Sequence, residues 1–275
     1  MDKVIMVVVD GLAYQTAVDQ CGFLESLVEG GKARRWKMRT VLPTLSAPIY
    51  ETLHTGTVPH EHGITSNENR RASTSTHVFG VVRKAHKKTA AVANAYFSTL
   101  YNRDPYLHRR DMEVNDEGLA IQHGRFYDDK NHSSYNIGLP SDIDLFNMVN
   151  LLTDRYNPDY LLYHNCSCDS VGHLFGCDSP QYKKSAWLID DLFAQNLQEW
   201  VAAGYRVLIT ADHGFTDFGH HGGTTDDVRY VPFYDVGHPN PGVADAVADQ
   251  LAVAPTILDR MGISIPASMI VKPLD

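Results

Sequence analysis

The sequence has little that would tie the chain to a membrane or to a nucleic acid. No apolar run reaches the about 20 residues that a membrane-spanning helix needs. The apolar stretch from Met1 to Asp10 is too short for a secretion signal, ends in an acid and is followed by no small-residue cleavage site. The formal net charge of -9 argues against a basic surface that would bind nucleic acid. We therefore expect a cytoplasmic protein with neither a membrane nor a nucleic-acid partner.

Cysteine is also scarce, with four residues in a chain of 275. Three of them, Cys166, Cys168 and Cys177, are close together in the sequence. A structural zinc site usually draws on two cysteine pairs with wider spacing, and here a single Cys-x-Cys has no second pair. We favour buried free thiols over a cysteine-based zinc site. The chain also has neither an internal repeat nor a low-complexity segment.

Segments typical of strands alternate with segments typical of helices. Lys3–Val9 is a continuous apolar run, as in a central parallel strand covered on both faces. Ser141 is a suitable N-cap for a helix that begins at residue 142. The other expected strands span residues 89–95, 160–163 and 206–210, and the expected helices span residues 23–28, 46–54, 142–156, 181–203 and 243–261. This alternation predicts an α/β fold, with a mostly parallel central sheet, helices on both faces and right-handed crossovers, as one domain over residues 1–275.

The segment 68–140 has a different character. Polar, aromatic and turn residues are dense in it, notably at 102–106 and 126–135. We interpret most of it as an insertion that packs beside the sheet and caps the substrate, although surface loops with small elements would look the same. Six basic residues of this segment would either hold a substrate carboxylate or form a solvated face. They are Lys84, Lys87, Lys88, Arg103, Arg109 and Arg110.

Polar clusters follow three of the expected strands. Asp10 comes directly after the first strand, residues 168–173 follow another, and Asp212 and His213 follow a third. Ligands of parallel sheets bind at the carboxyl ends of the strands, so these residues should meet at one edge. The 14 histidines make a metal site an obvious hypothesis, because histidine is the commonest transition-metal ligand.

Three short motifs supply metal-ligand side chains. Asp169 and His173 are four residues apart in a predicted loop, with a glycine between them, and Asp212 and His213 are followed by a glycine that allows a turn. Glycines bracket the pair His220 and His221, which compete for one ligand position. Each motif alone is a weak signal. Together with Asp10 they offer mixed oxygen and nitrogen ligands that suit zinc better than magnesium or calcium.

Ser46 is the candidate nucleophile. It lies in a Leu-Pro-Thr-Leu-Ser-Ala-Pro stretch at the start of an expected helix, where free backbone N–H groups favour phosphate oxygens. A nearby zinc ion would lower the pKa of its hydroxyl. The local sequence supports a simple helix N-cap even better, since that is the commonest use of such a serine. Thr44 is a second candidate nucleophile.

The order of these motifs resembles the alkaline phosphatase superfamily, and within it the nucleotide pyrophosphatase/phosphodiesterase branch. The shared pattern is Asp10, Pro43-Thr44-x-Ser46-x-Pro48, His62-Gly63-Ile64, Asp169-x-x-Gly172-His173, Asp212-His213-Gly214 and His221-Gly222. The stretch 253–258 also resembles the closing helix of the superfamily. The part between about Arg70 and Asp159 carries no matching motif.

The resemblance implies an alkaline-phosphatase-like fold and a role for each matching position. It implies two divalent metal ions, most simply zinc, with manganese or iron as alternatives. Ser46 would be the nucleophile, and Asn67 would donate a hydrogen bond to a phosphate oxygen. The ligands would be Asp169, His173 and His221 for the first ion, and Asp10, Asp212, His213 and the Ser46 oxygen for the second.

Some positions depart from the family pattern. Many members of the branch use threonine where this chain has Ser46, but both side chains are hydroxyls. Residues 49–51 lack the Asn-His that is usual in the branch, which leaves the fine substrate class open. Sulfatases of the same superfamily carry an arginine where this chain has Tyr50, and they prefer asparagine at His213. The sequence therefore argues against a sulfatase.

We expect a two-metal hydrolase that cleaves a phosphodiester or a nucleotide pyrophosphate through a phosphoryl-serine intermediate. The substrate would be a small phosphorus ester. A carbon–phosphorus hydrolase of the phosphonoacetate type is the first alternative. A phosphomonoesterase is the second, because no arginine in the sequence stands out as a clamp for a dianionic phosphate. A structural zinc protein without catalysis is the alternative outside the enzymes, although an open ligand position argues against it.

Overall fold

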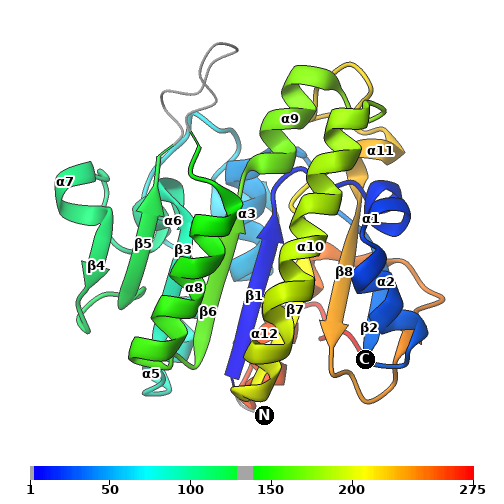
Figure 1. The fold of residues 1–275 in the computed structure, drawn as a ribbon. Coiled ribbons are helices and arrows are strands. Elements are labelled where there is room, and N and C mark those ends of the chain that lie inside the picture. The colour runs from blue at the N-terminus through cyan, green and yellow to red at the C-terminus, as the bar shows by residue number, and fades with distance from the viewer. Residues whose placement is uncertain (1–2, 129–138) are drawn as a thin grey trace.

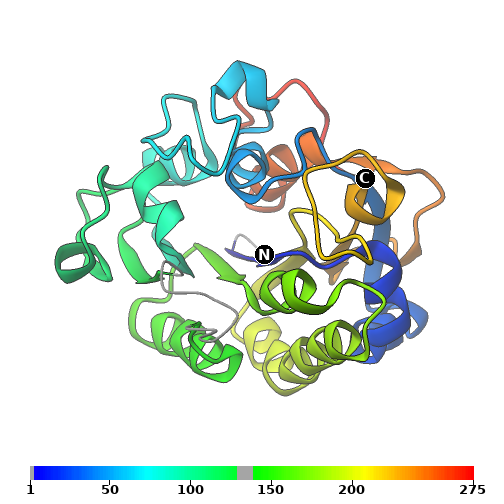
Figure 2. The same ribbon diagram turned by 90° about the horizontal axis from the view of Figure 1, so that it is seen from above.

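The computed structural model describes residues 3–128 and 139–275. Within them, ten strands form one sheet that helices cover on both faces (Figures 1 and 2). The strand order is β10-β2-β8-β7-β1-β6-β3-β5-β4, and β9 pairs with β2. The strands are β1 (Lys3–Val9), β2 (Ala33–Arg39), β3 (Thr89–Asn94), β4 (Glu113–Asn115), β5 (His123–Tyr127), β6 (Tyr160–Asn165), β7 (Tyr205–Thr210), β8 (Tyr230–Val236), β9 (Gly242–Val243) and β10 (Ala248–Asp249). The predicted α/β class is confirmed.

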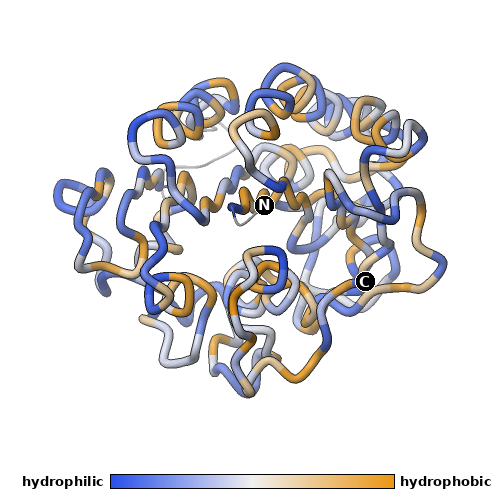
Figure 3. The backbone as a smooth tube through the Cα atoms, turned by 90° about the horizontal axis from the view of Figure 1, so that it is seen from below, coloured by the Kyte–Doolittle hydropathy of each residue, from blue (hydrophilic) through white to orange (hydrophobic). Residues whose placement is uncertain are grey.

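The helices vary widely in length. Those of the first half are α1 (Tyr14–Gln20), α2 (Gly22–Glu29), α3 (Ser46–Thr55), α4 (Pro59–His62), α5 (Val78–Lys84), α6 (Ala95–Tyr101) and α7 (His108–Asp111). Those of the second half are α8 (Asp142–Tyr156), α9 (Ser167–Phe175), α10 (Pro180–Ala202), α11 (Asp226–Arg229) and α12 (Val253–Arg260), with a 3-10 turn at Gln250–Ala252. Hydrophobic and hydrophilic residues alternate around the flanking helices (Figure 3), as expected for helices with one face on the sheet. In the described part of the chain, no helix combines the length and the apolar character needed to cross a membrane.

Local sequence explains several element boundaries. The Ser141 side chain accepts a hydrogen bond from the backbone of Asp144, so it caps α8 as predicted. The longest helix, α10, begins with a capping Ser179 followed by Pro180, which suits a first helical turn. At the other end of α3, Gly56 adopts a left-handed conformation with a φ of 63°, which ends the helix.

The sheet is parallel at its centre and mixed toward its edges. Both neighbours of β1 are parallel to it, and β3 is parallel to β5 and β6. The exceptions among the described strands are β8, antiparallel to β2 and β7, and β4, antiparallel to β5. The central strand β1 is buried on both faces from Val4 to Val9. A mostly parallel sheet was therefore the correct prediction.

Two predicted elements were wrong. The expected loop before Gly176 contains helix α9, because a short segment that packs against α10 gains a helical stability that its sequence alone does not predict. The expected helix over 243–261 is instead two short strands, a 3-10 turn and the shorter α12. Backbone pairing of β9 and β10 with β2 occupies its first part, and this pairing overrides the helical pattern.

The segment 68–140 extends the sheet. It supplies β3, which lies between β5 and β6, and it supplies β4 and β5 at the sheet's edge. Its residues 129–138, which include most of the turn-rich stretch 126–135, lie outside the described residues. Among the described residues of this segment, only those that line the functional site are in a position to cap a substrate. The capping role therefore stays a prediction.

Candidate active site

The strand register brings the polar clusters to one edge of the sheet. Val9 of β1 pairs with Asn165 of β6, and Val8 pairs with Thr210 of β7. The three strands therefore end nearly level, and Asp10 emerges beside the residues that follow β6 and β7. The prediction that the clusters after these strands converge is confirmed.

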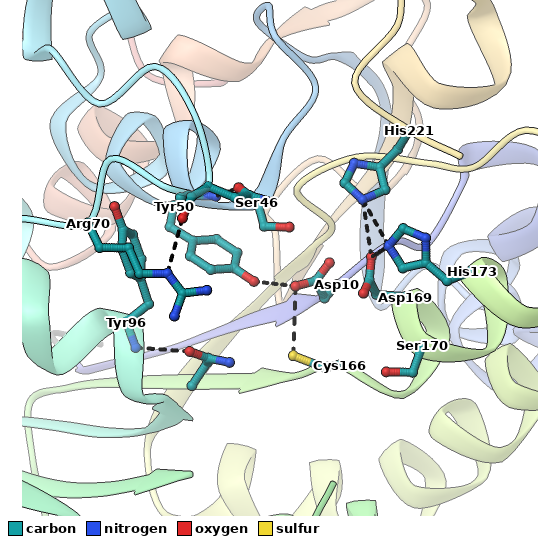
Figure 4. A pocket seen from close by; sticks show the side chains of 13 residues that line it. Asp10, Ser46, Tyr50, Arg70, Tyr96, Cys166, Asp169, Ser170, His173 and His221 are labelled. Atoms are coloured by element: carbon teal, nitrogen blue, oxygen red, sulfur yellow. Dashed lines mark hydrogen bonds and ion pairs between the residues drawn. The ribbon is translucent and has the colours of Figure 1, made fainter. Parts of the chain in front are cut away.

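A cavity of about 220 Å³ opens at this edge (Figure 4). Its walls come from the ends of β1, β3 and β6, from the first turn of α3, from α9, and from the loops that follow α4 and β7. The lining residues are Asp10, Ser46, Ala47, Tyr50, Asn67, Arg70, Asn94, Tyr96, Cys166, Asp169, Ser170, His173 and His221. Both residues predicted to act on the substrate, Ser46 and Asn67, are among them.

Asp169, His173 and His221 form one group of ligand atoms. Asp169 and His173 are one turn apart on α9, so both side chains project from the same face of the helix. The Oδ1 atom of Asp169 lies 3.6 Å from the Nε2 atom of each histidine. The two Nε2 atoms are 3.2 Å apart. These three predicted ligands of the first ion thus face a common point.

Asp10, Asp212 and His213 form a second group beside Ser46. The Nε2 atom of His213 lies 3.7 Å from Asp10 Oδ1, 3.3 Å from Asp212 Oδ2 and 3.2 Å from Ser46 Oγ. The His213 ring also stacks on His221, with ring centres 3.8 Å apart. His213 therefore lies between the two groups, and its ring nitrogen is also close enough to Asp169 and His221 to join theirs.

The three histidines are oriented alike by the backbone. The Nδ1 atom of each lies 2.9 to 3.1 Å from a carbonyl oxygen. The acceptors are Gly219 for His173, Gly214 for His213 and Thr44 for His221. Because a carbonyl only accepts, each Nδ1 carries the proton, and the neutral ring presents the lone pair of Nε2 to the group. This arrangement is usual for metal-binding histidines.

The carboxylates of the second group would also be stabilised by a bound cation. Asp10 and Asp212 are almost fully buried. Burial, and then the charge of Asp10, raise the pKa of the Asp212 carboxyl well above its usual value. Asp212 Oδ1 accepts hydrogen bonds from two backbone N–H groups, whereas Oδ2 accepts none from the described residues. Burial lowers the pKa of His213 well below 6.5 and that of His221 to about 4. The two groups are therefore rich in lone pairs, and a divalent ion fits them.

Ser46 begins helix α3 and is not its cap. The N-cap position belongs to Leu45, and no side chain caps this helix. The interpretation of Ser46 as a simple N-cap is therefore wrong, and its hydroxyl faces the second ligand group. Asn67 lies beside it: its Oδ1 accepts a hydrogen bond of 2.9 Å from the Ala47 backbone, which turns its amide NH₂ toward the cavity.

The competing residues lie elsewhere. The Thr44 hydroxyl is buried and donates to the Gly223 carbonyl, so it is directed away from the cavity. His220 is exposed and joins no ligand group of the described residues. All four cysteines are free thiols, and none of the ligand groups in the described residues contains two of them. The preference for free thiols over a cysteine-based zinc site is consistent with this placement.

Three residues that the sequence reasoning missed surround Asp10. Tyr50 donates a hydrogen bond to Asp10 Oδ2, and its oxygen lies 2.9 Å from His164 Nε2. That same His164 nitrogen is 3.2 Å from Asp10 Oδ2. Cys166 Sγ lies within 3.9 Å of Asp10 Oδ2 as well. The signal for Tyr50 was its position one helical turn after Ser46, which puts both on one face of α3.

A second set of missed residues lines the far end of the cavity: Arg70, Asn94 and Tyr96. None of the six basic residues proposed from segment 68–140 lines it. Lys84, Lys87 and Lys88 surround a separate cavity, and Arg103 and Arg110 pair with Asp111. Because Arg70 does reach the site, the lack of an arginine no longer argues against a phosphomonoesterase.

Comparison with known proteins supports the branch expected from the motif order. A family model described as type I phosphodiesterase / nucleotide pyrophosphatase matches residues 4–230. GPI ethanolamine phosphate transferase 2 of Schizosaccharomyces pombe is 22% identical over an alignment of 252 positions, which covers 82% of this chain and 31% of that protein. The chain therefore spans about a third of the length of this curated relative.

Solved structures share the fold. Human ectonucleotide pyrophosphatase / phosphodiesterase 5 superposes with a TM-score of 0.71 at 15% identity, over 96% of both chains. An inactive variant of the murine protein in complex with AMP gives a TM-score of 0.70 at 12% identity, over 97% of this chain and 96% of that one. At these identities the similarity establishes an alkaline-phosphatase-like architecture.

Proposed function

The chain belongs to the type I phosphodiesterase / nucleotide pyrophosphatase family, and we propose that it is a metal-dependent hydrolase of a phosphodiester or nucleotide pyrophosphate with Ser46 as its nucleophile. One observation carries the proposal. The Ser46 hydroxyl and the Asn67 amide line one cavity with predicted ligands of both groups, Asp10, Asp169, His173 and His221, and the Nε2 atom of His213 lies 3.2 Å from Ser46 Oγ.

The residues fit two divalent ions, and zinc suits the mixture of imidazole and carboxylate ligands. Asp169, His173 and His221 would hold one ion. Asp10, Asp212 and His213, with the Ser46 oxygen, would hold the other. A bound ion of this kind supplies electrostatic stabilisation and lowers the pKa of a hydroxyl or water molecule that it contacts.

Each side chain around the cavity then has its own role in the proposed reaction. Ser46, at the start of α3, attacks the phosphorus and forms the phosphoryl-serine, while the bond from phosphorus to one ester oxygen breaks and that alcohol leaves. Water then hydrolyses the phosphoryl-serine and restores the Ser46 hydroxyl. Asn67 donates its amide to a non-bridging oxygen, where negative charge grows as the new bond forms. Tyr50 and His164 hold the Asp10 carboxylate in place through their hydrogen bonds. Asp10, Tyr50 and His164 are buried, which strengthens the hydrogen bonds among them.

The choice of a diester rests on the family match, because the cavity also admits other phosphorus substrates. The murine structural relative was solved with AMP, which supports a nucleotide-type substrate for this chain. The curated relative is a transferase, so the acceptor here could be an alcohol in place of water. Adding glycerol to the assay and measuring the glycerol phosphodiester that keeps the substrate's retained arm separates these two outcomes.

The test is a parallel assay of the zinc-loaded protein on an aryl phosphodiester, an aryl phosphomonoester and phosphonoacetate, with and without a chelator. We expect clear preference for the diester and loss of turnover with the chelator. Preference for phosphonoacetate would move the assignment to carbon–phosphorus cleavage, and preference for the monoester would make the protein a phosphatase.

The nucleophile is tested by two matched hydroxyl variants. Ser46→Ala should lose nearly all turnover while it keeps most of its bound metal, because the other ligands of both groups remain. Thr44→Val removes a hydroxyl that donates to a backbone carbonyl outside the cavity, and it should stay active. Full activity of Ser46→Ala, with metal content measured on the same sample, would contradict the assignment.

A further inference from the structure

The cavity is electrostatically uneven along its length. Figure 4 shows Arg70 and Tyr96 at one end, His173 and His221 at the other, and Ser46 between them. Arg70 is the one permanently charged cation among the described lining residues. A substrate whose phosphorus lies at Ser46 would therefore extend one arm toward this arginine.

Arg70 is held so that the outer edge of its guanidinium stays available. Its Nε donates to the Asn67 carbonyl at 3.0 Å, and its Cζ lies 5.6 Å from the centre of the Tyr96 ring. These contacts use Nε and one face of the group. In residues 3–128 and 139–275, neither Nη atom has a hydrogen-bond or ion-pair partner in the structure. Because Asn67 is the predicted phosphate donor, this contact also ties Arg70 to the reacting centre.

Asn94 supplies a second donor at the same end. It is 5% exposed and ends strand β3, where its Oδ1 accepts a hydrogen bond of 2.9 Å from the Tyr96 backbone. The amide NH₂ lies on the cavity side and donates to no acceptor in the described part of the chain. Because this NH₂ group is open to the cavity and has no acceptor in the described part of the chain, it is available to donate a hydrogen bond to a ligand oxygen.

We propose that Arg70 and Asn94 form a subsite for a second negative charge, carried by the arm that stays bonded to phosphorus when Ser46 attacks. This inference rests on the proposed function and names its substrate class: phosphorus esters whose retained arm bears a carboxylate or a phosphate. A guanidinium presents two parallel N–H groups that match either anion, and the Asn94 amide adds a third donor.

Acidic residues beyond Arg70 restrict where the negative charge of the substrate arm can lie. A neighbouring cavity of about 190 Å³ shares Arg70 and Tyr96 with the first, and its wall includes Asp104 and Asp128. An anion placed farther out would meet these carboxylates. The subsite thus selects a negative charge at the depth of Arg70, and it disfavours a longer arm that carries the charge past it.

The experiment compares three diesters that share a 4-nitrophenyl leaving group. Their retained arms are phenyl, 3-carboxyphenyl and 3-phosphonophenyl, so the last two separate a carboxylate from a phosphate-like anion. The proteins are the wild type, Arg70→Met, Arg70→Lys and the control Arg109→Met. Arg109 is exposed on α7 and lies outside the cavity, so its substitution changes the net charge equally.

We expect the wild type to prefer at least one charged arm over phenyl, as measured by kcat/KM. Arg70→Met should lower that preference by roughly 10- to 100-fold, the loss expected when a hydrogen bond to a charged group is removed. Arg70→Lys should retain part of the preference for a charged arm, because lysine keeps the positive charge but lacks the two parallel N–H groups of the guanidinium. Arg109→Met should keep the preference of the wild type.

The outcomes separate this inference from the proposed function. If the wild type hydrolyses all three diesters equally, the subsite is wrong while the hydrolase assignment stands. If Arg70→Met slows all three by one common factor, Arg70 acts on the reacting phosphoryl group and the subsite is again wrong. If the metal-loaded wild type hydrolyses none of them, the proposed function fails, and the inference fails with it.

Discussion

Gly172 offers the sharpest test of how the fold positions the metal ligands. It lies in α9 between Asp169 and His173, and a Cβ atom at this position would lie 2.8 Å from two ring atoms of Phe215. Phe215 is fully buried, and its ring packs edge-on against His173 and His221, with ring centres 4.9 and 5.1 Å away. The Phe215 ring therefore cannot shift away from an added Cβ atom unless His173 and His221, the two predicted metal ligands that it contacts, shift as well.

The expected size of the effect follows from that contact. Carbon atoms pack well at about 3.6 Å, so Gly172→Ala requires a shift of roughly 0.8 Å between α9 and Phe215. Overpacking of this kind costs about 1–3 kcal/mol, and alanine gains about 1 kcal/mol over glycine within a helix. The variant should thus lose at most about 2 kcal/mol and still fold. A misplacement near 1 Å can lower the rate about 100-fold.

The assay measures kcat/KM on an aryl phosphodiester and the free energy of unfolding on the same protein. Gly80→Ala is the matched control, because Gly80 is also helical and the atom nearest to its added Cβ would be His77 Nε2, at 3.4 Å. The control should be stabilised slightly and stay fully active. An active Gly172→Ala protein, within a factor of about three of the wild type, would refute the reasoning that Phe215 fixes the ligand geometry.

Three further predictions concern other positions. Asn67→Ala should lower kcat roughly 100- to 1,000-fold in steady-state assays, whereas Asn69→Ala, which loses a bond to the Gly63 carbonyl, should change it far less; equal losses would contradict the donor role. Burial lowers the pKa of His54 to about 3, so the unfolded state takes up its proton first as the pH falls below 6.5. The free energy of unfolding should drop by about 2 kcal/mol from pH 7 to pH 5 through this residue, and denaturant melts of His54→Phe should show a correspondingly smaller drop. Asp235→Ala removes a buried carboxylate that pairs with two arginines, and it should cost about 3–5 kcal/mol in the same melts; a loss below 1 kcal/mol would show that the pairs contribute little.

Much of the sheet, and the convergence of most candidate site residues at its edge, could be predicted from sequence because they depend on local patterns. A fully apolar run such as Val4–Val9 has few alternatives to a buried strand, and the acid that follows it marks the edge where ligands bind. Ser46 was a candidate from its place at a helix start, where the local sequence favoured an N-cap, and the resemblance to the superfamily implied its role as nucleophile. Its role as nucleophile, and those of the other site residues, stay predictions until they are tested.

The sequence alone therefore determined the α/β class, the strand ends and the family to which the motifs belong. Only the tertiary structure decided that α9 is a helix, because isolated segments of that length are marginal and packing stabilises them. It also decided which residues share the cavity. Tyr50, Arg70, Asn94 and Cys166 come from four separate segments, and side chains meet across such distances only when register and crossovers place their backbones together.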